Sequence, residues 1–359
     1  MSIFKMMEES GCEQVTFCYD KSSGLKAIIV IHDTTLGPAL GGCRMWPYKT
    51  EEEALRDGIR LARGMTYKNA GSGLNYGGGK TVIWGDPKEK SEEMFRALGR
   101  FVGGFNGRYM TGTDVGTTPD DFVFSRHETR WVVGLPEEYG GGGSTAIPTA
   151  YGVFEGIRAT LEEAFGDPSL KGRRVAVQGL GKVGSLLTGM LIDAGAHVTA
   201  CDVLPDNVAR VKEKYGAAIE TVDPDFIFDV ACDVFSPNAL GAVLNDDTIP
   251  RLKCRVVAGA ANNQLAEPRH GDQLHQRGIL YAPDFIINAG GVIQAADELE
   301  GFRRERVMHK VRDITRRLRL VYRISKETGL PTHRAAEVMV EQRIAKLGHI
   351  QRIYMNPSA

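Results

Sequence analysis

The sequence contains no C-x-x-C pair, no H-E-x-x-H motif and no long apolar run. No apolar stretch approaches the ~20 residues that a membrane span needs, and the start, MSIFKMMEESGCEQ, lacks the basic flank and apolar segment of a signal peptide. The cysteines are scattered singly, as in a cytoplasmic protein with reduced thiols. They are Cys12, Cys18, Cys43, Cys201, Cys232 and Cys254. We therefore expect a cytoplasmic protein with no metal site and no membrane segment.

An excess of one charge is also missing. Lysine and arginine total 44 against 45 for aspartate and glutamate, which argues against bulk affinity for nucleic acid or an anionic membrane. The segment 303–326 is an exception, with ten lysines or arginines and two acids. A nucleic-acid patch and a solvated or subunit-contacting helical face both remain open. The near absence of interleaved aromatic residues favours the second interpretation.

Glycine is the residue in surplus, with 43 among 359 residues against a typical share of ~7%. The glycines cluster at 71–79, 99–107, 139–143, 179–184 and 290–291. Ordinary loops account for some of these clusters. Glycine also lets the backbone approach a ligand closely and lets a hinge turn, so the clusters are candidates for binding segments.

The length and the pattern of elements predict a two-domain α/β protein. In the first part, helices alternate with strands, and the helix 50–65 begins with a capping box of Thr50 and Glu53. The segment 139–148 reads as a linker because of its glycines and its proline. From residue 149 on, strands alternate more regularly with helices, which predicts a parallel sheet. The expected strands are 26–33, 81–84, 108–114, 173–178, 197–202 and short pieces at 233–237, 255–261 and 278–283, and the chain is helical from 303, with a break at 329–331.

A dinucleotide site is predicted by VAVQGLGKVGSLL, which contains G-x-G-x-x-G as Gly179, Gly181 and Gly184. The motif follows an expected strand and opens an expected helix. The next strand ends in Asp202, at the spacing where an acid binds the ribose hydroxyls and repels a 2′-phosphate. This context favours a dinucleotide site over an ordinary strand–helix turn. The acid at position 202 favours NAD over NADP. Lys182, Val183 and Val203 are expected beside the cofactor.

The stretch GSGLNYGGGKTVIW (71–84) poses a separate question, because Lys80 directly follows three glycines. It is not the phosphate loop G-x-x-x-x-G-K-[ST]. Position 74 is Leu74 where that motif needs glycine, and the strand comes after the lysine rather than before it. Lys80 therefore needs another role.

Two lysines and a carboxylate lie beside the glycine loops of the first domain: Lys68, Lys80 and Asp114. They suit a zwitterionic substrate, because one lysine can pair with a carboxylate while the aspartate receives an ammonium. The other lysine would be a base. A lysine acts as a base near neutral pH only when burial and a neighbouring positive charge favour its neutral form. Taken singly, each lysine is better interpreted as a surface residue at the end of a helix or loop, and it is the glycine setting together with the cofactor domain that favours a role at the site.

Four long runs resemble the amino acid dehydrogenases that act on leucine, valine and phenylalanine, which are relatives of glutamate dehydrogenase. The runs are GPALGGCRM (37–45), GMTYKNAGSGLNYGGGK (64–80), TGTDVGTTPDDF (111–122) and APDFIINAGGVIQAADELEG (282–301). The resemblance covers nearly the whole chain. It implies reversible oxidative deamination, in which an L-amino acid, NAD⁺ and water give a 2-oxo acid, ammonium and NADH.

The resemblance also implies an organisation. Residues 1–148 would form a substrate-binding and oligomerisation domain, completed by the C-terminal helix 333–359. Residues 149–332 would form the NAD-binding Rossmann domain, with a cleft between the two. The chain would assemble as a homo-oligomer based on dimers, with an octamer as one form, and would bind neither nucleic acid nor membrane.

Roles follow from the resemblance residue by residue. Lys68 would bind the substrate carboxylate with the backbone of Gly41 and Gly42, Lys80 would activate water, and Asp114 would hold the amino group and shuttle protons. Other positions would contact the cofactor or the substrate near the nicotinamide: Thr149, Ala260, Asn263 and Asn288. One departure is Asn238, where relatives often carry cysteine, which leaves that contact with the cofactor ribose uncertain.

The substrate side chain is expected against Leu40, Gly112, Val292 and Ala295. Gly112 in Gly-Thr-Asp is similar to the phenylalanine enzymes, whereas leucine enzymes tend to have Ala-Glu-Asp there. Ala295 replaces a valine common in relatives, and the glutamine in GGVIQAADE also favours phenylalanine, while Val292 favours the aliphatic enzymes. L-phenylalanine is therefore the predicted substrate, with leucine or valine as the alternative. A non-catalytic NAD-binding sensor is a further alternative. A hydroxy-acid dehydrogenase would need a histidine–carboxylate pair that the sequence does not offer.

Overall fold

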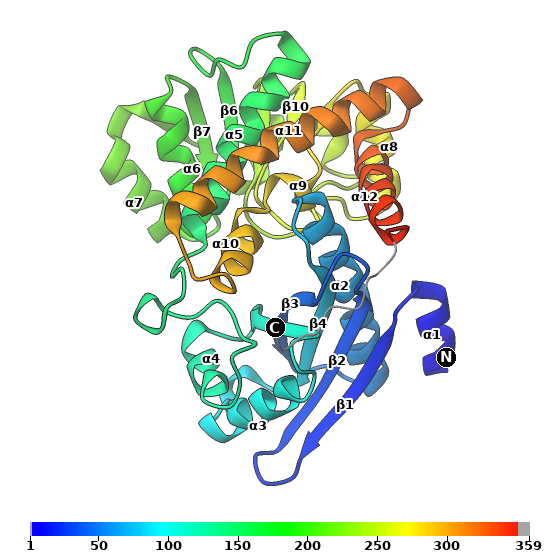
Figure 1. Cartoon of the computed structure of the whole chain (residues 1–359). Coiled ribbons are helices and arrows are strands. Elements are labelled where there is room, and N and C mark those ends of the chain that lie inside the picture. The colour runs from blue at the N-terminus through cyan, green and yellow to red at the C-terminus, as the bar shows by residue number, and fades with distance from the viewer. Residues whose placement is uncertain (1, 351–359) are drawn as a thin grey trace. The chain divides into compact units, whose positions relative to one another are not determined.

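The computed structural model describes residues 2–350 and consists of two compact α/β units (Figure 1). Unit 1 comprises Met1–Gly141 and the chain from Val338 on, and unit 2 comprises Gly142–Glu337. The first boundary lies in the glycine-rich segment 139–148, and the second lies within the last helix. The expected two-domain α/β fold is thereby confirmed.

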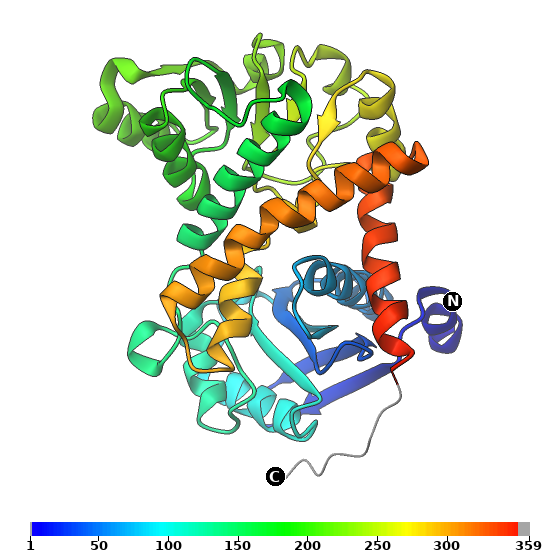
Figure 2. The same ribbon diagram turned by 45° about the horizontal axis from the view of Figure 1, so that its top comes forward.

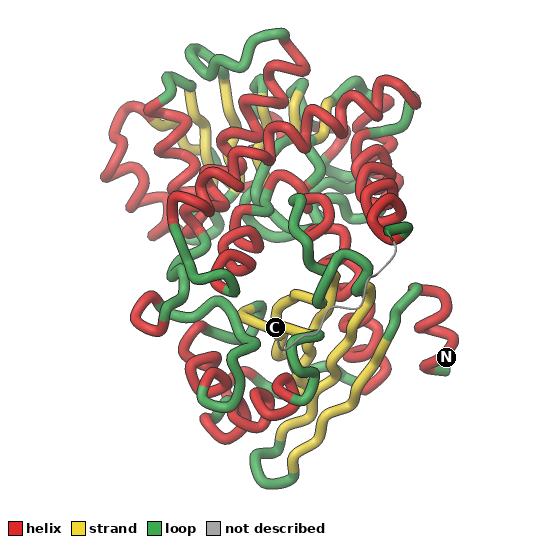
Figure 3. Tube along the Cα trace, viewed as in Figure 1, coloured by secondary structure: helices red, strands yellow, loops and turns green. Residues whose placement is uncertain are grey.

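A mixed sheet of five strands forms the centre of unit 1 in the described residues (Figure 3). The strand order is β1-β2-β4-β3-β5. β2 pairs antiparallel with β1 and β4, while β3 pairs parallel with β4 and β5. The strands are β1 (Gln14–Asp20), β2 (Leu25–Asp33), β3 (Ala39–Trp46), β4 (Gly77–Trp84) and β5 (Tyr109–Thr113).

Helices cover both faces of this sheet, which is why the inner strand β2 is apolar along almost its whole length. On one face, α2 packs Leu55 and Ile59 against Val30 and Val82. On the other face, α3 and α4 bury an apolar cluster that includes Phe95. The helices are α1 (Ile3–Ser10), α2 (Glu51–Gly71), α3 (Glu92–Gly103) and α4 (Pro119–Arg126), with short 3₁₀ turns η1 (Pro87–Glu89) and η2 (Glu137–Tyr139).

The glycine run before Lys80 lies inside strand β4 and not in a loop, which corrects the expected strand 81–84. A Cβ atom on Gly78 would lie 2.1 Å from the Thr66 backbone nitrogen, so helix α2 rests directly on the strand backbone. The buried Asn69 side chain joins the same elements, because its Nδ2 donates to the carbonyls of Leu40 (3.0 Å) and Gly77 (2.6 Å). These glycines are required for close helix–strand packing.

Unit 2 is built on a parallel sheet of six strands, all between residues 174 and 281, as the sequence predicts. The strand order is β11-β10-β9-β6-β7-β8. The strands are β6 (Arg174–Gln178), β7 (His197–Cys201), β8 (Ile219–Thr221), β9 (Val234–Pro237), β10 (Val256–Val257) and β11 (Leu280–Tyr281). The expected strand 255–261 is therefore shortened to two residues, and the rest of that segment forms a loop.

The helices of unit 2 begin with α5, which starts at Ala146, so Thr149 lies within its first turn and not ahead of it. α5 packs against α6 and α11, and Figures 1 and 2 both show α11 lying across α5. The elements are α5 (Ala146–Phe165), α6 (Lys182–Asp193), α7 (Pro205–Tyr215), η3 (Gly216–Ala218), η4 (Pro224–Asp229), η5 (Ile249–Arg251), α8 (Pro268–Gln276), α9 (Asp284–Ile287), α10 (Gly290–Glu298), α11 (Arg304–Thr328) and α12 (Thr332–Gly348).

Several basic side chains of the segment 303–326 form ion pairs within unit 2. Arg306 and Lys310 both contact the fully buried Asp297, at 2.5 and 3.3 Å, and Arg319 pairs with Glu162 at 2.6 Å. These pairs join α11 to α10 and α5. Part of the basic charge of this segment is therefore neutralised by ion pairs that hold helices together, which disfavours the nucleic-acid interpretation.

Replacement of Asn69 by alanine should destabilise unit 1. The buried Leu40 and Gly77 carbonyls would lose their shared donor, at a cost of about 1–3 kcal/mol. All three tryptophans (Trp46, Trp84 and Trp131) lie in unit 1, so the midpoint of urea unfolding followed by tryptophan fluorescence measures this change. The control is Arg56→Ala, which removes an exposed pair with Glu52 and should change the midpoint little. Equal effects of the two variants would contradict the role given to Asn69.

Candidate active site

A cluster of charged side chains surrounds Asp114, which directly follows β5. Lys80 Nζ from β4 lies 2.8 Å from Asp114 Oδ2, and Arg44 Nε from β3 lies 3.1 Å from the same oxygen. β4, β3 and β5 are parallel neighbours in that order, so the three side chains come from adjacent positions in the sheet. The structure thus joins Lys80 and Asp114, which lie 34 residues apart in the chain.

The Lys80 side chain is buried, which is rare for a lysine. Lys80 is only 4% exposed, because its strand is covered by α2. Burial by itself raises the pKa of the Asp114 carboxyl, but the adjacent Lys80 ammonium and Arg44 guanidinium outweigh it and leave the pKa below its usual value. Asp114 is therefore a carboxylate at neutral pH, and its side chain remains 25% exposed. A partly exposed carboxylate beside a buried ammonium can bind a cationic amine and exchange protons with it.

Gly42 provides the space in which this pair forms. A Cβ atom on Gly42 would lie 2.9 Å from Asp114 Cβ and 3.3 Å from Lys80 Nζ. The neighbouring Gly41 allows no side chain either, since its Cβ would lie 1.7 Å from the Gly79 carbonyl oxygen. The two glycines thus bring bare backbone to the Lys80–Asp114 pair, where a small ligand can approach it closely.

Arg44 is the residue of this site that the sequence analysis missed. Its Nη1 atom contacts Asp57 Oδ2 at 3.0 Å, and the Tyr48 hydroxyl donates to the same Asp57 oxygen at 2.7 Å. Asp57 and Tyr48 hold the guanidinium while its Nε reaches Asp114. The available signal was position, since Arg44 follows Gly42 by two residues in the run GPALGGCRM.

Other expected substrate residues lie on the same elements. Lys68 is half-buried in the last part of α2, next to Asn69, and Leu40 is buried on β3. Gly112 pairs with Gly42 across β5 and β3. A Cβ atom on Gly112 would meet the Val133 carbonyl oxygen at 2.6 Å. An added methyl at Gly112 would therefore press on the Val133 backbone rather than fill open space.

The glycine motif of unit 2 forms the turn between β6 and α6. Gly179 has a positive φ of 93°, and a Cβ on Gly184 would lie 2.0 Å from the Gly179 carbonyl oxygen. Gly181 precedes the first residue of α6, and a Cβ there would meet nothing within 4 Å. The first and third glycines are thus needed by the fold, while the second leaves space before a helix N-terminus. That arrangement fits a pyrophosphate.

Asp202 lies at the same turn, directly after β7. Its Oδ2 accepts a hydrogen bond from the Leu180 backbone nitrogen at 2.6 Å, and its Oδ1 accepts one from the Leu204 nitrogen at 2.8 Å. The carboxylate is thereby fixed beside the glycine turn. Each oxygen retains a lone pair for a ribose hydroxyl. Val203 is largely exposed next to it, and Lys182 is exposed at the start of α6.

A polar network joins the other expected cofactor residues near the carboxyl ends of β9 and β10. Asn238 Oδ1 accepts from the Ala260 nitrogen at 2.9 Å, and the buried Asn288 donates from Nδ2 to the Ala260 carbonyl at 3.1 Å. Asn263 is exposed in the same loop, with a positive φ of 51°. Asn238 thus has a structural role as a brace between loops. Ligands of open parallel sheets bind at this edge, where the strand order reverses beside the first strand.

Val292, Ala295 and Thr149 lie on helices of the same unit. Val292 and Ala295 are three residues apart on α10 and both are partly exposed, while Ile293 and Ala296 between and beyond them are buried. A Cβ on Gly291 would lie 3.3 Å from Thr149 Oγ1, so the start of α10 adjoins the start of α5. The sequence-predicted residues therefore form two groups, one in each unit.

Two features are absent among residues 2–350. No helix there has the length and apolarity needed to cross a membrane. No three His, Cys, Asp or Glu side chains are grouped so that they could hold a metal ion in that part of the chain.

Comparison with known proteins identifies the family. Residues 12–133 match the model "Glu/Leu/Phe/Val dehydrogenase, dimerisation domain", and residues 140–351 match "Glutamate/Leucine/Phenylalanine/Valine dehydrogenase". A leucine dehydrogenase of Geobacillus stearothermophilus is 56% identical over 96% of this chain and 94% of its own. A phenylalanine dehydrogenase of Thermoactinomyces intermedius is 51% identical over 98% and 97%.

A solved structure agrees with these matches. The crystal structure of an L-tryptophan dehydrogenase from Nostoc punctiforme superposes with a TM-score of 0.87, at 43% identity, over 96% of this chain and 99% of that one. The two family models together span both units, and they meet near the boundary between them. This chain belongs to the glutamate/leucine/phenylalanine/valine dehydrogenase family of amino acid dehydrogenases.

Proposed function

We propose that the protein catalyses the reversible oxidative deamination of an apolar L-amino acid with NAD⁺, giving the 2-oxo acid, ammonium and NADH. The observation that carries this proposal is the contact of 2.8 Å between the buried Lys80 ammonium and the Asp114 carboxylate, beside the bare backbone of Gly42. A zwitterionic amino acid needs a cation for its carboxylate, an anion for its ammonium and a group that activates water. Unit 1 offers all three.

The steps are assigned to this chain's own side chains. Lys68 and the backbone at Gly41 and Gly42 bind the substrate carboxylate. Asp114 accepts a hydrogen bond from the substrate ammonium and takes one of its protons. Once the substrate is an imine, Lys80 in its neutral form removes a proton from water as that water attacks the Cα atom. Asp114 then returns a proton to the departing ammonia.

The cofactor is proposed to bind unit 2 and to accept the hydride from the substrate Cα. Gly179, Gly181 and Gly184, with Lys182 and Val183, would hold the pyrophosphate at the start of α6. Asp202 would accept from the ribose hydroxyls and repel a 2′-phosphate, which favours NAD⁺ over NADP⁺. Val203, next to Asp202, would contact the cofactor at the same ribose. Further contacts with the nicotinamide half or its ribose are assigned to Thr149, Asn238, Ala260 and Asn288, and Asn263 would contact the substrate beside the nicotinamide.

The assembly is proposed to be a homo-oligomer of dimers. The family model that covers residues 12–133 is described as a dimerisation domain, so the N-terminal part of the chain would contain the dimer interface. In this proposal residues 1–148 and 333–359 bind the substrate and form the oligomer, and residues 149–332 bind NAD.

L-phenylalanine is the proposed preferred substrate. Ala295, a small and partly exposed residue on α10, leaves room for a ring, and this residue supports the proposal better than Gly112 does. Gln294 gives weaker support, because it is buried and its Nε2 donates to the Gly143 carbonyl at 3.1 Å. Leucine is the second candidate, favoured by Val292 and by the higher identity to a leucine dehydrogenase, 56% against 51%.

Lys80→Ala should lower kcat by ~10²–10⁴-fold, because the water-activating group is lost. NAD⁺ binding, measured by fluorescence titration, should remain normal. The matched control is Lys90→Ala, since Lys90 forms a comparable 2.7 Å pair with Asp121 elsewhere in unit 1. Turnover of Lys80→Ala near that of the wild type would refute the role of Lys80. A wild-type protein that binds NAD⁺ but deaminates none of a panel of L-amino acids would instead be a sensor.

Arg44→Gln should shift the acid limb of the kcat profile to higher pH. Arg44 helps to hold the pKa of Asp114 below its usual value, so its loss raises that pKa and protonates the carboxylate at a higher pH than in the wild type. Misplacement of Asp114 should add a loss of kcat of up to ~100-fold. Arg44→Lys keeps the charge and should retain the wild-type limb better. An unchanged pH profile with only KM altered would contradict this prediction and would place Arg44 outside the protonation chemistry.

The ratio of kcat/KM for L-phenylalanine to that for L-leucine should exceed one, by ~10-fold or more, because an aliphatic side chain leaves apolar surface of a ring-sized pocket uncovered. Ala295→Val should lower this ratio by adding two methyl groups on the partly exposed face of α10. A wild-type ratio at or below one would assign the chain to the leucine and valine enzymes. Gly112→Ala is unsuitable for this test because its methyl would collide with the Val133 backbone.

A further inference from the structure

Two of the six cysteines face each other across neighbouring strands of unit 2. β9 and β10 are parallel and pair Val234 with Val256, and an isolated bridge just before them pairs Ala231 with Lys253. The same register therefore sets Cys232 directly opposite Cys254. The Cys232 backbone nitrogen also donates to the Lys253 carbonyl at 3.3 Å, which holds the two chain segments together at this point.

The geometry of adjacent strands suits a bond between these two thiols. Neighbouring strands lie ~4.8 Å apart, which is within the usual Cα separation of ~4.4–6.8 Å for a disulfide. Residues in register project their side chains to the same face of the sheet. The thiols of Cys232 and Cys254 are already hydrogen-bonded to each other. Both are free thiols in this structure.

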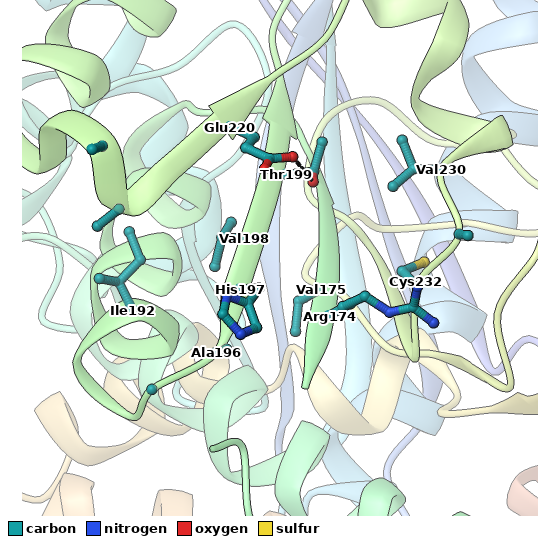
Figure 4. A pocket seen from close by; sticks show the side chains of 14 residues that line it. Arg174, Val175, Ile192, Ala196, His197, Val198, Thr199, Glu220, Val230 and Cys232 are labelled. Atoms are coloured by element: carbon teal, nitrogen blue, oxygen red, sulfur yellow. Dashed lines mark hydrogen bonds between the residues drawn. The ribbon is translucent and has the colours of Figure 1, made fainter. Parts of the chain in front are cut away.

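A cavity gives small molecules access to one member of the pair. Cys232 lines a hollow of about 520 Å³ at the amino ends of β6 and β7, together with Arg174 and His197 (Figure 4). In that view the Arg174 side chain extends toward Cys232. The glycine turn of the proposed dinucleotide site lies at the opposite, carboxyl ends of these strands. The cavity is thus separate from the site assigned to the cofactor.

The surroundings make the two thiols unequal. The hydrogen bond from Cys254 lowers the pKa of Cys232, and the Arg174 guanidinium adds to this effect against burial and the Asp233 carboxylate. The same hydrogen bond, together with burial, raises the pKa of Cys254. Burial raises the pKa of every other cysteine of the chain, namely Cys12, Cys18, Cys43 and Cys201. Because Cys232 lines the cavity and Cys254 does not, Cys232 is assigned as the thiol that meets the hydroperoxide in its reactive thiolate form.

We propose that Cys232 and Cys254 form a reversible oxidation site, in which a hydroperoxide that enters the cavity converts the thiol pair to a disulfide. This role is independent of the proposed deamination, and neither requires the other.

The chemistry balances in two steps. The Cys232 thiolate attacks the hydroperoxide, so that an S–O bond forms and the O–O bond breaks, and an alcohol, or water from hydrogen peroxide, leaves after taking up a proton. The Cys254 sulfur then attacks the resulting sulfenic acid. An S–S bond forms, the S–O bond breaks, and a second water leaves with the Cys254 proton. Two electrons pass from the two sulfurs to the peroxide, and a dithiol reductant reverses the process.

The experiment treats the full chain with a slight molar excess of hydrogen peroxide under native conditions, removes the peroxide, unfolds the chain in urea with N-ethylmaleimide to block the remaining thiols, and maps peptides without reduction. We expect the number of alkylated cysteines to fall from six to four, a cross-linked peptide containing Cys232 and Cys254, and full recovery after dithiothreitol. Absence of this link, or oxidation spread over the other cysteines, would overturn the proposal. So would conversion of Cys232 to sulfinic acid while Cys254 remains a thiol.

Variants separate the two roles. In Cys254→Ser, a 1,3-dione probe should label Cys232 as a trapped sulfenic acid, whereas in Cys232→Ser peroxide should leave Cys254 alkylatable. The matched control is Cys201→Ser, which removes another buried cysteine of unit 2 and should still form the link. Labelling of Cys254 rather than Cys232 would contradict the assigned order. The wild-type peptide map decides the proposal even if a variant fails to fold.

Discussion

The contact between Lys80 and Asp114 depends on helix α2 lying directly on the backbone of strand β4. A side chain on Gly78 would collide with α2 at Thr66 and Ala62, so only glycine there permits this packing, whereas side chains on Gly77 and Gly79 would collide with Asp33 and Tyr109. The helix then buries Lys80 to 4% exposure and leaves it one charged partner on β5 and another cation, Arg44, beside that partner. A buried ammonium is tolerated only with such compensation. The proposed chemistry uses Lys80 and Asp114, and Arg44 helps to keep Asp114 ionised.

In unit 2 the two ends of the parallel strands differ in the groups that they carry. At the carboxyl ends of its strands, Asp202 and the Asn238–Ala260–Asn288 network are fixed by hydrogen bonds to backbone atoms. At the amino ends, the pair of Cys232 and Cys254 borders a cavity instead. The two ends of the same parallel strands are therefore proposed to support unrelated chemistry, since only the carboxyl ends carry the glycine turn and the helix N-terminus.

Family membership and substrate preference rest on different parts of the molecule. Identity of 51–56% to leucine and phenylalanine dehydrogenases reflects the whole chain, whereas the side-chain pocket involves few positions. Ala295 and Val292 favour different substrates, and Gly112 faces the Val133 backbone rather than open space. A difference of a few methyl groups decides specificity of this kind, so a direct comparison of two substrates is more informative than overall similarity.

The sequence by itself determined the two α/β domains and the parallel sheet of unit 2, because these depend on local periodicity and turns. It also singled out Lys80, Asp114 and the glycine motif as site residues from their motif spacing, and the roles given to them are proposals. It placed the glycine run in a loop, because glycine lowers strand propensity and only the packing of α2 explains the presence of these glycines in β4. It also ended the strand 255–261 too late. The tertiary structure alone revealed Arg44 as a partner of Asp114, the direction of Gly112, and the register that sets Cys232 opposite Cys254. These contacts join residues far apart in the chain, and their pairing is decided by how strands align and helices pack, which local sequence does not specify.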